Sequence, residues 1–327
     1  MSASNRKKLL LPGTMGRAGW DVVRARADIE AVSYAVDMPT PEFRAILADA
    51  DGIALSVTPF REAEIAAAPR LAVVARIGVG YDAVEVPALT QRRIPLMVAG
   101  LANAVSVAEH AVFLMMALAK RGARLHELVQ QGKWPERFAN LPVDLFERTV
   151  LIVGFGRIGT RTAARCRAME MRVLIYDPYV PAAAIRAAGC EPAADLDAAV
   201  AEADFITIHC PKNPETTGMF DAARLARMKP TAFLVNTARG GIIDETALHG
   251  ALTSGRLAGA GLDVFEQEPT PVDNPLLHLP NVITAPHVAG VTRESLERMA
   301  VATARNLLSV LDGTPIRENV INKEVLS

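Results

Sequence analysis

The sequence has few cysteines, few aromatic residues and no long apolar segment. Its three cysteines, Cys166, Cys190 and Cys210, are too few and too far apart for a disulfide framework or a zinc pattern. We therefore expect free thiols, a reducing cytoplasmic location and no metal site. The longest apolar run, Ala111–Ala119, is too short to span a bilayer. The basic cluster at residues 6–8 precedes too few apolar residues for a secretion signal.

The chain also lacks an excess of charge of either sign. Its formal net charge is −1 at pH 7, half of its residues are hydrophobic and 22% are charged. No strong field therefore favours nucleic acid or an anionic membrane, and we expect neither as a partner. A length of 327 residues is enough for two domains, each with its own core.

The most informative stretch runs from residue 148 to residue 177. An apolar, β-branched strand is predicted at Thr149–Val153, a helix at Thr160–Met169 and a second strand at Arg172–Tyr176, which ends in Asp177. Between the first strand and the helix, glycines stand in G-x-G-x-x-G spacing at Gly154, Gly156 and Gly159.

This strand–turn–helix–strand unit predicts a dinucleotide site. The glycines permit a tight turn, close approach of a pyrophosphate and close helix–strand packing, while helix-terminal amides meet the phosphates. Asp177 can accept a hydrogen bond from a ribose 2′-hydroxyl, which favours NAD over NADP. A lone glycine pattern could be an ordinary turn, but the complete unit favours nucleotide binding.

Short apolar runs and helix-like segments alternate on both sides of this unit, which indicates α/β domains with parallel sheets. Before it, strands are predicted at 8–11, 52–57, 71–75 and 95–98, and helices at 41–50, 62–68 and 87–92. After it, strands are predicted at 205–209, 232–236, 258–262 and 282–284, and helices at 182–188, 196–203, 244–254 and 292–311.

Two segments in the first part of the chain have more than one interpretation. The amides of Gly78-Val79-Gly80 could hold a substrate carboxylate, or the segment could be a simple βα turn. Ala104–Gln131 predicts one long helix capped near Asn103. Because its apolar residues cover most of its circumference, it could pack only on the sheet or could also form a subunit interface.

Polar residues follow the later strands, at the sheet edge where ligands of open α/β sheets bind. Arg239 can bind a carboxylate by two hydrogen bonds. His287 can exchange a proton near neutral pH, and Glu268 can hold its tautomer. Each has a duller interpretation, a surface arginine, a packed histidine or a solvated turn, but their joint placement favours catalysis. His209 is a weaker candidate, because in that loop the backbone could be what matters.

Six segments resemble the D-isomer-specific 2-hydroxyacid dehydrogenases, the family of phosphoglycerate, D-lactate and formate dehydrogenases. They are R-I-G-V-G-Y-D (76–82), N-A-V-S-V-A-E-H (103–110), V-G-F-G-R-I-G (153–159), N-T-A-R-G-G-I-I-D-E (236–245), G-L-D-V-F-E-Q-E-P (261–269) and P-H-V-A-G (286–290). The resemblance implies two Rossmann-like α/β domains. A substrate domain of residues 1–103 plus 293–327 would be completed by the final helix, and residues 104–292 would form the NAD-binding domain.

The resemblance also implies roles for individual residues. The catalytic set would be Arg239, Glu268 and His287. Substrate contacts would be Gly78, Val79, Gly80, Asn103 and Arg239. The NAD contacts would be Gly154, Gly156, Arg157, Ile158, Gly159, Asp177, Cys210, Pro211, Thr216, Thr237, Ala238, Arg239, Asp263, His287 and Gly290. Family members usually form homodimers through the helix that matches Ala104–Ala119, so a homodimer is expected.

The expected function is NAD-dependent interconversion of a small D-2-hydroxy acid and its 2-keto acid, with phosphoglycerate or hydroxypyruvate and glyoxylate as model substrates. In the first-domain loop where phosphoglycerate dehydrogenases tend to carry a phosphate-binding arginine, Ser56 lies near the expected place and Arg61 follows a few residues on. We also expect no regulatory domain after residue 327. Both features weaken a phosphoglycerate assignment. Glu268, where formate dehydrogenases have glutamine, disfavours that activity. Alternatives are an NADH-sensing corepressor or scaffold, or a homocysteine-releasing hydrolase. The sequence does not identify the acid.

Overall fold

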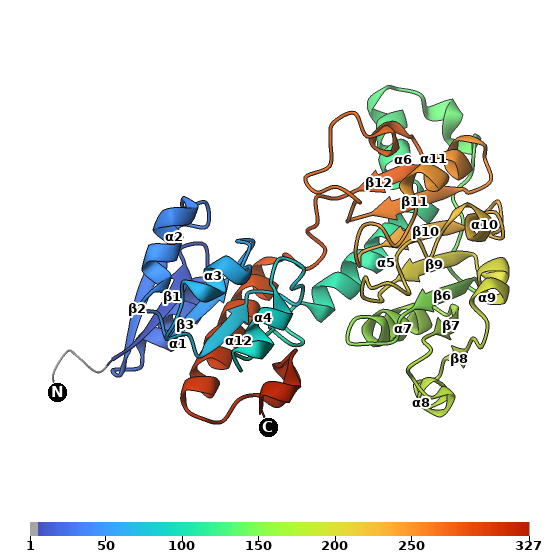
Figure 1. The fold of residues 1–327 in the computed structure, drawn as a ribbon. Helices are drawn as coiled ribbons and strands as arrows, with labels where there is room; N and C mark the ends of the chain where they lie inside the picture. The colour runs from blue at the N-terminus through green and yellow to red at the C-terminus, as the bar shows by residue number, and fades with distance from the viewer. Residues whose placement is uncertain (1–5, 327) are drawn as a thin grey trace. The chain divides into compact units, whose positions relative to one another are not determined.

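The computed structural model describes residues 6–326, which divide into two compact units (Figure 1). One contains the described residues through Asn103 together with those from Val291 onward, and the other is Ala104–Gly290. Chain crossings at residues 103–104 and 290–291 therefore join two bodies, each built around its own parallel sheet.

The first unit has a five-stranded parallel sheet in the order β2-β1-β3-β4-β5, a common doubly wound order. Its strands are β1 (Lys7–Pro12), β2 (Ile29–Tyr34), β3 (Gly52–Leu55), β4 (Val73–Arg76) and β5 (Leu96–Met97). Its helices are α1 (Arg17–Arg24), α2 (Thr40–Leu47), α3 (Glu62–Ala66), α4 (Val86–Gln91) and α12 (Arg293–Leu311). One core lies between the sheet and α2 to α4, and the other between the sheet and α1 with α12.

The final helix, α12, completes this first unit. It begins at a capping box in which the Thr292 hydroxyl and the Ser295 amide pair at 3.0 Å. The Thr303 hydroxyl then donates to the carbonyl of Arg76 at 3.1 Å, and the Asn306 amide donates to that of Val98 at 2.8 Å. These buried bonds tie the end of the chain to the sheet formed by its beginning.

The second unit has a seven-stranded parallel sheet in the order β12-β11-β10-β9-β6-β7-β8, the Rossmann order with one more strand. Its strands are β6 (Thr149–Val153), β7 (Arg172–Tyr176), β8 (Glu191–Pro192), β9 (Phe205–Ile208), β10 (Phe233–Asn236), β11 (Gly259–Leu262) and β12 (Val282–Thr284). Its helices are α5 (Ala104–Lys120), α6 (Gly122–Gln130), α7 (Gly159–Ala168), α8 (Ala182–Ala187), α9 (Leu196–Glu202), α10 (Ala222–Leu225) and α11 (Glu245–Thr253).

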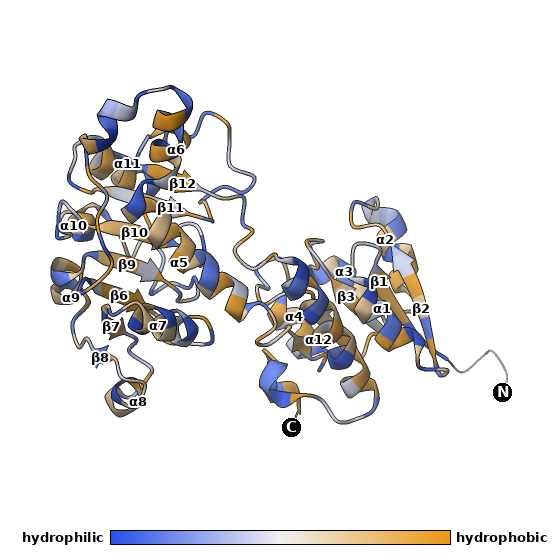
Figure 2. Ribbon diagram, turned by 180° about the vertical axis from the view of Figure 1, so that it is seen from behind, coloured by the Kyte–Doolittle hydropathy of each residue, from blue (hydrophilic) through white to orange (hydrophobic). Residues whose placement is uncertain are grey.

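Helices cover both faces of this second sheet. Side chains of α5, α7 and α8 form the core on one face, and those of α9, α10 and α11 form it on the other. The central strands are hydrophobic in composition (Figure 2), as strands buried on both faces require. Gly259 and Gly261 of β11 let α5 lie close, because a Cβ on Gly261 would stand 3.0 Å from that of Leu114.

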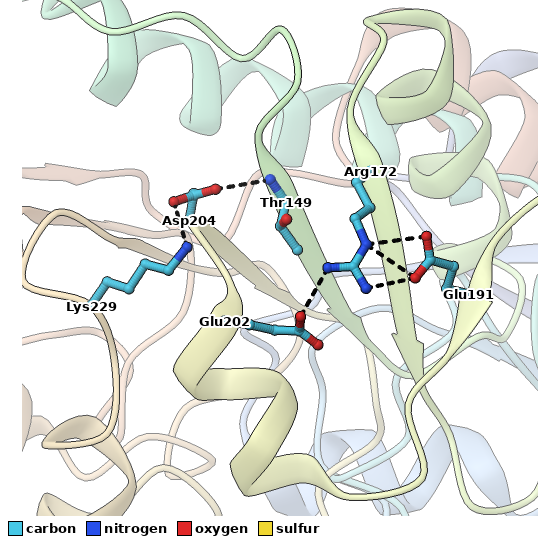
Figure 3. Close-up of polar contacts among 6 residues, drawn as sticks. All are labelled: Thr149, Arg172, Glu191, Glu202, Asp204 and Lys229. Atoms are coloured by element: carbon cyan, nitrogen blue, oxygen red, sulfur yellow. Dashed lines mark hydrogen bonds and ion pairs between the residues drawn. The ribbon is translucent and has the colours of Figure 1, made fainter.

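Charged side chains bind one another and the backbone at the amino ends of the central strands (Figure 3). This edge of the sheet is opposite the one formed by the carboxyl ends of the strands. Asp204 accepts hydrogen bonds from the Thr149 amide and from Lys229, each at 2.9 Å. Arg172 binds Glu191 and Glu202, the latter at 2.8 Å. Burial raises the pKa of Asp204, but its two donors outweigh burial and hold the pKa below its ordinary value.

The structure confirms the predicted fold class and corrects several elements. The predicted helix Ala104–Gln131 is two helices, because Arg121 adopts a left-handed backbone (φ 52°) immediately before Gly122, a poor helix former. A short 3₁₀ helix follows at Trp134–Phe138. Among the described residues, four strands and α-helices were not predicted, namely α1, β2, β8 and α10.

Candidate functional site

Six neighbouring strands of the second sheet end level with one another. Val153 pairs with Tyr176 and with Ile208, and Asn236 pairs with Ile208 and with Leu262, which pairs with Thr284. The residues that come next along each strand are Gly154, Asp177, His209, Thr237, Asp263 and Ala285. The register therefore brings segments up to 130 residues apart to one carboxyl edge, where open α/β sheets bind ligands.

The glycine turn after β6 has the shape that its sequence predicts. Gly154 has φ 98°, and a Cβ there would stand 2.7 Å from the amide nitrogen of Cys210. On Gly159 it would stand 2.0 Å from the Gly154 carbonyl oxygen, so helix α7 begins directly against the strand. On Gly156 it would meet nothing within 4 Å. This open position, with Arg157 and Ile158 beside it, fits a pyrophosphate approaching the backbone.

Asp177 stands at the end of β7 with both carboxylate oxygens in use. One accepts from the Phe155 amide at 2.8 Å, and the other from the Tyr179 amide at 2.9 Å. The first bond ties the carboxylate to the glycine turn across two strands. Each oxygen has a second lone pair, so the arrangement can still accept a ribose hydroxyl.

The loop after β9 is shaped by bonds within itself. The Thr216 hydroxyl donates to the Pro211 carbonyl at 2.7 Å and accepts from the Asn213 amide at 2.9 Å. Burial raises the pKa of the Cys210 thiol to about 11 and lowers that of His209 to about 3. His209 is therefore neutral and serves poorly as a proton donor, in keeping with its weaker standing in the sequence.

The loop after β10 carries Arg239 and is held by Asn236, which accepts from the Ala238 amide at 3.0 Å and donates to the Arg239 carbonyl at 2.9 Å. The buried Thr237 hydroxyl has no partner among the described residues, as expected for a group that awaits a ligand. Glycine is required at 240, because a Cβ there would stand 1.7 Å from the Phe265 carbonyl oxygen. That close approach brings the arginine loop against the segment that carries Glu268.

Glu268 and His287 form the central contact of the site. His287 Nδ1 lies 2.6 Å from Glu268 Oε2, and Glu268 Oε1 accepts from the Phe265 amide at 3.0 Å. The side chains remain 48% and 35% exposed, respectively. Glu268 therefore orients a ring whose second nitrogen, Nε2, can exchange a proton with a ligand.

The two side chains shift each other's proton affinity. The hydrogen bond to Glu268 raises the pKa of His287, although burial and the charge of Arg239 oppose the rise. Burial raises the pKa of Glu268, but His287, the Phe265 amide and Arg239 outweigh burial and leave the pKa lowered. Both directions favour the imidazolium–carboxylate pair. The charge of Arg239 lowers the pKa of both groups, and its guanidinium donates to the Ala238 carbonyl of its own loop at 2.7 Å.

Asp263, buried at the end of β11, fixes the backbone on which His287 stands. Its carbonyl accepts from the His287 amide at 2.8 Å, and its carboxylate accepts from the Val288 and Ala289 amides at 2.7 and 2.9 Å. His287 itself has φ 53°, a strained conformation for a residue other than glycine. Asp263 thus stabilises a backbone turn that aims the imidazole, up to the segment's end at Gly290.

Sequence reasoning missed two features around Asp263. Burial raises the pKa of this carboxyl, and the Ala289 and Val288 amides and the imidazoles of His110 and His287 oppose the rise. His110 lies on α5, and its Nε2 is buried without a partner among the described residues. Only the fold brings it near Asp263, since more than 150 residues separate them. Glu266, which is close to Glu268 in sequence, binds the start of α11, where its carboxylate accepts from the Glu245 amide at 3.1 Å.

The predicted substrate contacts Gly78, Val79, Gly80 and Asn103 belong to the first unit. Within the described chain, the amides of residues 78 to 80 donate no hydrogen bond, and Gly78 has φ 132°. Asn103 Oδ1 is buried without a partner in the described chain. Arg76 donates to the Gly80 carbonyl at 2.8 Å and to the Leu55 carbonyl at 3.0 Å, so it braces two loops of this unit.

Residues 6–326 contain neither a group of metal-ligating side chains nor a membrane-spanning helix. No group of three or more histidine, cysteine or acidic side chains gathers there as metal ligands. No helix in that range is long and apolar enough to cross a membrane.

Comparison with known proteins identifies the family. Residues 112–289 match the family described as "D-isomer specific 2-hydroxyacid dehydrogenase, NAD binding domain". The chain is 40% identical over 282 residues to a glyoxylate reductase of Korarchaeum cryptofilum, covering 85% of this chain and 84% of the relative. It is 41% identical over 258 residues to a D-3-phosphoglycerate dehydrogenase of Archaeoglobus fulgidus, covering 79% of this chain and 48% of the relative.

Solved structures show the same fold. The D-lactate dehydrogenase of Aquifex aeolicus, complexed with NAD and lactic acid, matches with a TM-score of 0.85 and 28% identity over 96% of this chain and 99% of that one. A glyoxylate reductase of Paecilomyes thermophila matches with a TM-score of 0.86 and 26% identity, covering 98% and 99%. The chain spans about half the length of the first phosphoglycerate dehydrogenases it matches, 48% and 56%. The chain belongs to the D-isomer specific 2-hydroxyacid dehydrogenase family, and its second unit contains the NAD-binding domain of that family.

Proposed function

We propose that the chain is an NAD-dependent dehydrogenase or reductase that interconverts a small D-2-hydroxy acid and its 2-keto acid. The observation that carries this proposal is the contact of 2.6 Å between His287 Nδ1 and Glu268 Oε2, with Arg239 in the same site. A fold that only sensed a nucleotide would not need an imidazole whose proton affinity is raised by a carboxylate.

Each side chain has one task in this reaction. Arg239 holds the substrate carboxylate and polarises the keto oxygen. His287 Nε2 takes the hydroxyl proton in oxidation and returns it in reduction, while Glu268 stabilises the imidazolium. When bound, NAD supplies the hydride acceptor, or NADH the donor, and the edge from Gly154 to Gly290 would hold it. The free amides of residues 78 to 80 and the Asn103 side chain are the further substrate contacts that we propose.

The first unit favours a substrate without a phosphate. Ser56 stands at the position expected for a phosphate-binding arginine. Arg61 pairs with Glu85 at 3.7 Å, and Arg76 spends its guanidinium on two backbone carbonyls. Both nearby cations therefore already have protein partners. We expect glyoxylate or hydroxypyruvate to be reduced faster than phosphohydroxypyruvate.

Turnover measurements test the proposal. The purified chain with NADH would be assayed on glyoxylate, hydroxypyruvate, pyruvate, phosphohydroxypyruvate, and branched and sulfonated keto acids. Reduction of at least one acid with a kcat of about 1 s⁻¹ or more, typical of enzymes, is expected. NADH binding without turnover on any acid would instead favour the alternative, a nucleotide-sensing corepressor or scaffold.

We further propose that the chain is a cytoplasmic homodimer. One face of α5 packs on the sheet, but Phe113 on its other side is 56% exposed. After α6, four large apolar side chains are also exposed, Trp134 (61%), Phe138 (68%), Leu141 (63%) and Phe146 (53%). A second copy of the chain that covered these side chains would remove them from water. Light scattering should give a molar mass twice that of the monomer. The substitution Phe113→Glu should lower the molar mass toward that of one monomer. All three cysteines are free, in keeping with a reducing compartment.

A further inference from the structure

A hydrogen bond joins two loops at the edge of the second sheet. The hydroxyl of Tyr179, in the loop after β7, donates to the carboxylate of Glu215, in the loop after β9. Strands β7 and β9 flank β6 on its two sides. The contact therefore runs from one side of β6 to the other, where the glycine turn at Gly154–Gly159 begins.

Both partners are positioned by their own loops. The Tyr179 amide donates to Asp177 at 2.9 Å, and the Glu215 amide donates to the Asn213 side chain at 2.9 Å. Asp177 in turn accepts from Phe155 of the glycine turn at 2.8 Å. Tyr179 thus contacts two carboxylates, Asp177 through its amide and Glu215 through its hydroxyl.

The electrostatics agree with this placement. The hydrogen bond to Glu215 and its negative charge raise the pKa of the Tyr179 phenol, and the charge of Asp177 adds to the rise. Both carboxylates therefore act on one small region. Tyr179 is 74% exposed, so the bond buries little apolar surface and adds little to the core. A role in the nucleotide site explains the contact better than a role in stability.

We propose that Glu215, held in place by Tyr179, is a second carboxylate that makes the chain prefer NAD to NADP. This inference rests on the proposed function, because it assumes that the adenosine ribose lies at Asp177. Asp177 both accepts from the ribose and repels a 2′-phosphate, whereas the role proposed for Glu215 is the repulsion of that phosphate by its negative charge.

The competing explanation is a purely structural tie between the two loops. The substitution Glu215→Gln distinguishes the two explanations, because glutamine keeps an oxygen that can accept from Tyr179 but removes the negative charge. Tyr179→Phe removes the hydroxyl and keeps the ring, which frees the Glu215 side chain. Glu170→Gln is the matched control, since it removes one exposed negative charge before β7, at the opposite edge of the same sheet.

The experiment measures the dissociation constants of NAD and NADP with the full chain by calorimetry at low and high salt. We expect Glu215→Gln to tighten NADP binding about three- to tenfold and to change NAD binding by less than about twofold. Tyr179→Phe should give part of that gain, and Glu170→Gln none. The gain should shrink at high salt, because exposed charges are screened.

Three outcomes would overturn the inference. In the first, Asp177→Asn lowers the ratio of the NADP to the NAD dissociation constant, but Glu215→Gln leaves this ratio unchanged. Glu215 would then only hold the two loops together. A gain that persists at high salt would show that charge is not its cause. If the unaltered chain binds neither nucleotide, the proposed function fails, and this inference fails with it.

Discussion

The two units use glycine after their first strand for different purposes. In the first, Gly13, Gly16 and Gly19 follow β1, and a Cβ on Gly19 would stand 2.6 Å from the Ala300 carbonyl oxygen. Gly16 and Gly19 let α12 pack closely, whereas Gly13 faces Ser33 and Tyr34 of β2. In the second, a Cβ on Gly156 would meet nothing within 4 Å. Glycine spacing therefore shows where other atoms can approach the backbone closely. Whether a glycine serves packing or binding depends on whether a protein segment or open space lies opposite it.

The carboxyl edges of the two sheets differ in the same way. Strands β10 to β12 of the second unit are followed by Arg239, by the carboxylates of Asp263 and Glu268 and by His287, whose side chains bond to one another or to the backbone. The loop after β4 of the first unit presents the amides of residues 78 to 80. In the function proposed above, acid–base chemistry belongs to the second unit and neutral anion contacts belong to the first.

The largest effect is expected from the loss of the proton-transfer group. His287→Ala should lower kcat by about two to four orders of magnitude, because the variant loses the imidazole that transfers the proton. Steady-state assays with NADH and the best keto acid would measure it. His278→Ala is the control, since this histidine lies in a short 3₁₀ helix and its Nε2 is 3.0 Å from the Val272 carbonyl oxygen. Near-normal turnover of His287→Ala would refute the assigned role.

The next effect concerns the choice of nucleotide. Asp177→Ala should lower the preference for NAD over NADP about tenfold or more, because the repulsion of a 2′-phosphate and the ribose contact are both lost. Comparison of kcat/KM for the two cofactors measures it. Asp177→Asn, which keeps an acceptor for one backbone amide, separates charge from loop shape. An Asp177→Ala variant that discriminates as well as the unaltered chain would contradict the site.

A pair of alanine substitutions tests the comparison of the glycines. Gly156→Ala should weaken NAD binding about tenfold, or roughly 1.4 kcal/mol, and leave stability unchanged, because its Cβ points into open space. Gly19→Ala should lower the free energy of unfolding by about 1–3 kcal/mol through overpacking against α12 and leave NAD binding unchanged. Denaturation and calorimetry measure both. If both variants lost NAD binding alike, or both lost stability alike, the two glycines would not differ in function as proposed.

Much of the fold could be predicted because several strands, β6 and β9 among them, are fully buried. Thr149–Val153 and Arg172–Tyr176 were predicted with their observed bounds, since an apolar β-branched run has few other places in a protein. Helix α1 was missed because Gly19 lowers its local propensity, and packing on α12 supplies its stability. Strand β8 has two residues, too few for a pattern.

The residues of the candidate site could be proposed from the sequence, but their geometry could not. The residues after each strand could be placed at one edge, but the contact between Glu268 and His287 depends on the backbone that Asp263 holds and on the close approach at Gly240. Those are tertiary contacts between separate loops. His110 near Asp263 had no local signal, because a histidine on an apolar helix is usually packed in the core.

The pH dependence of keto acid reduction in Glu268→Gln tests the central claim most directly. Reduction needs protonated His287, so kcat/KM should fall as pH rises through the pKa of His287, which Glu268 raises above its ordinary value of about 6.5. Without that carboxylate, burial and Arg239 still lower the pKa, so the fall should begin at a lower pH than in the unaltered chain. An unchanged or higher apparent pKa in Glu268→Gln would contradict the account.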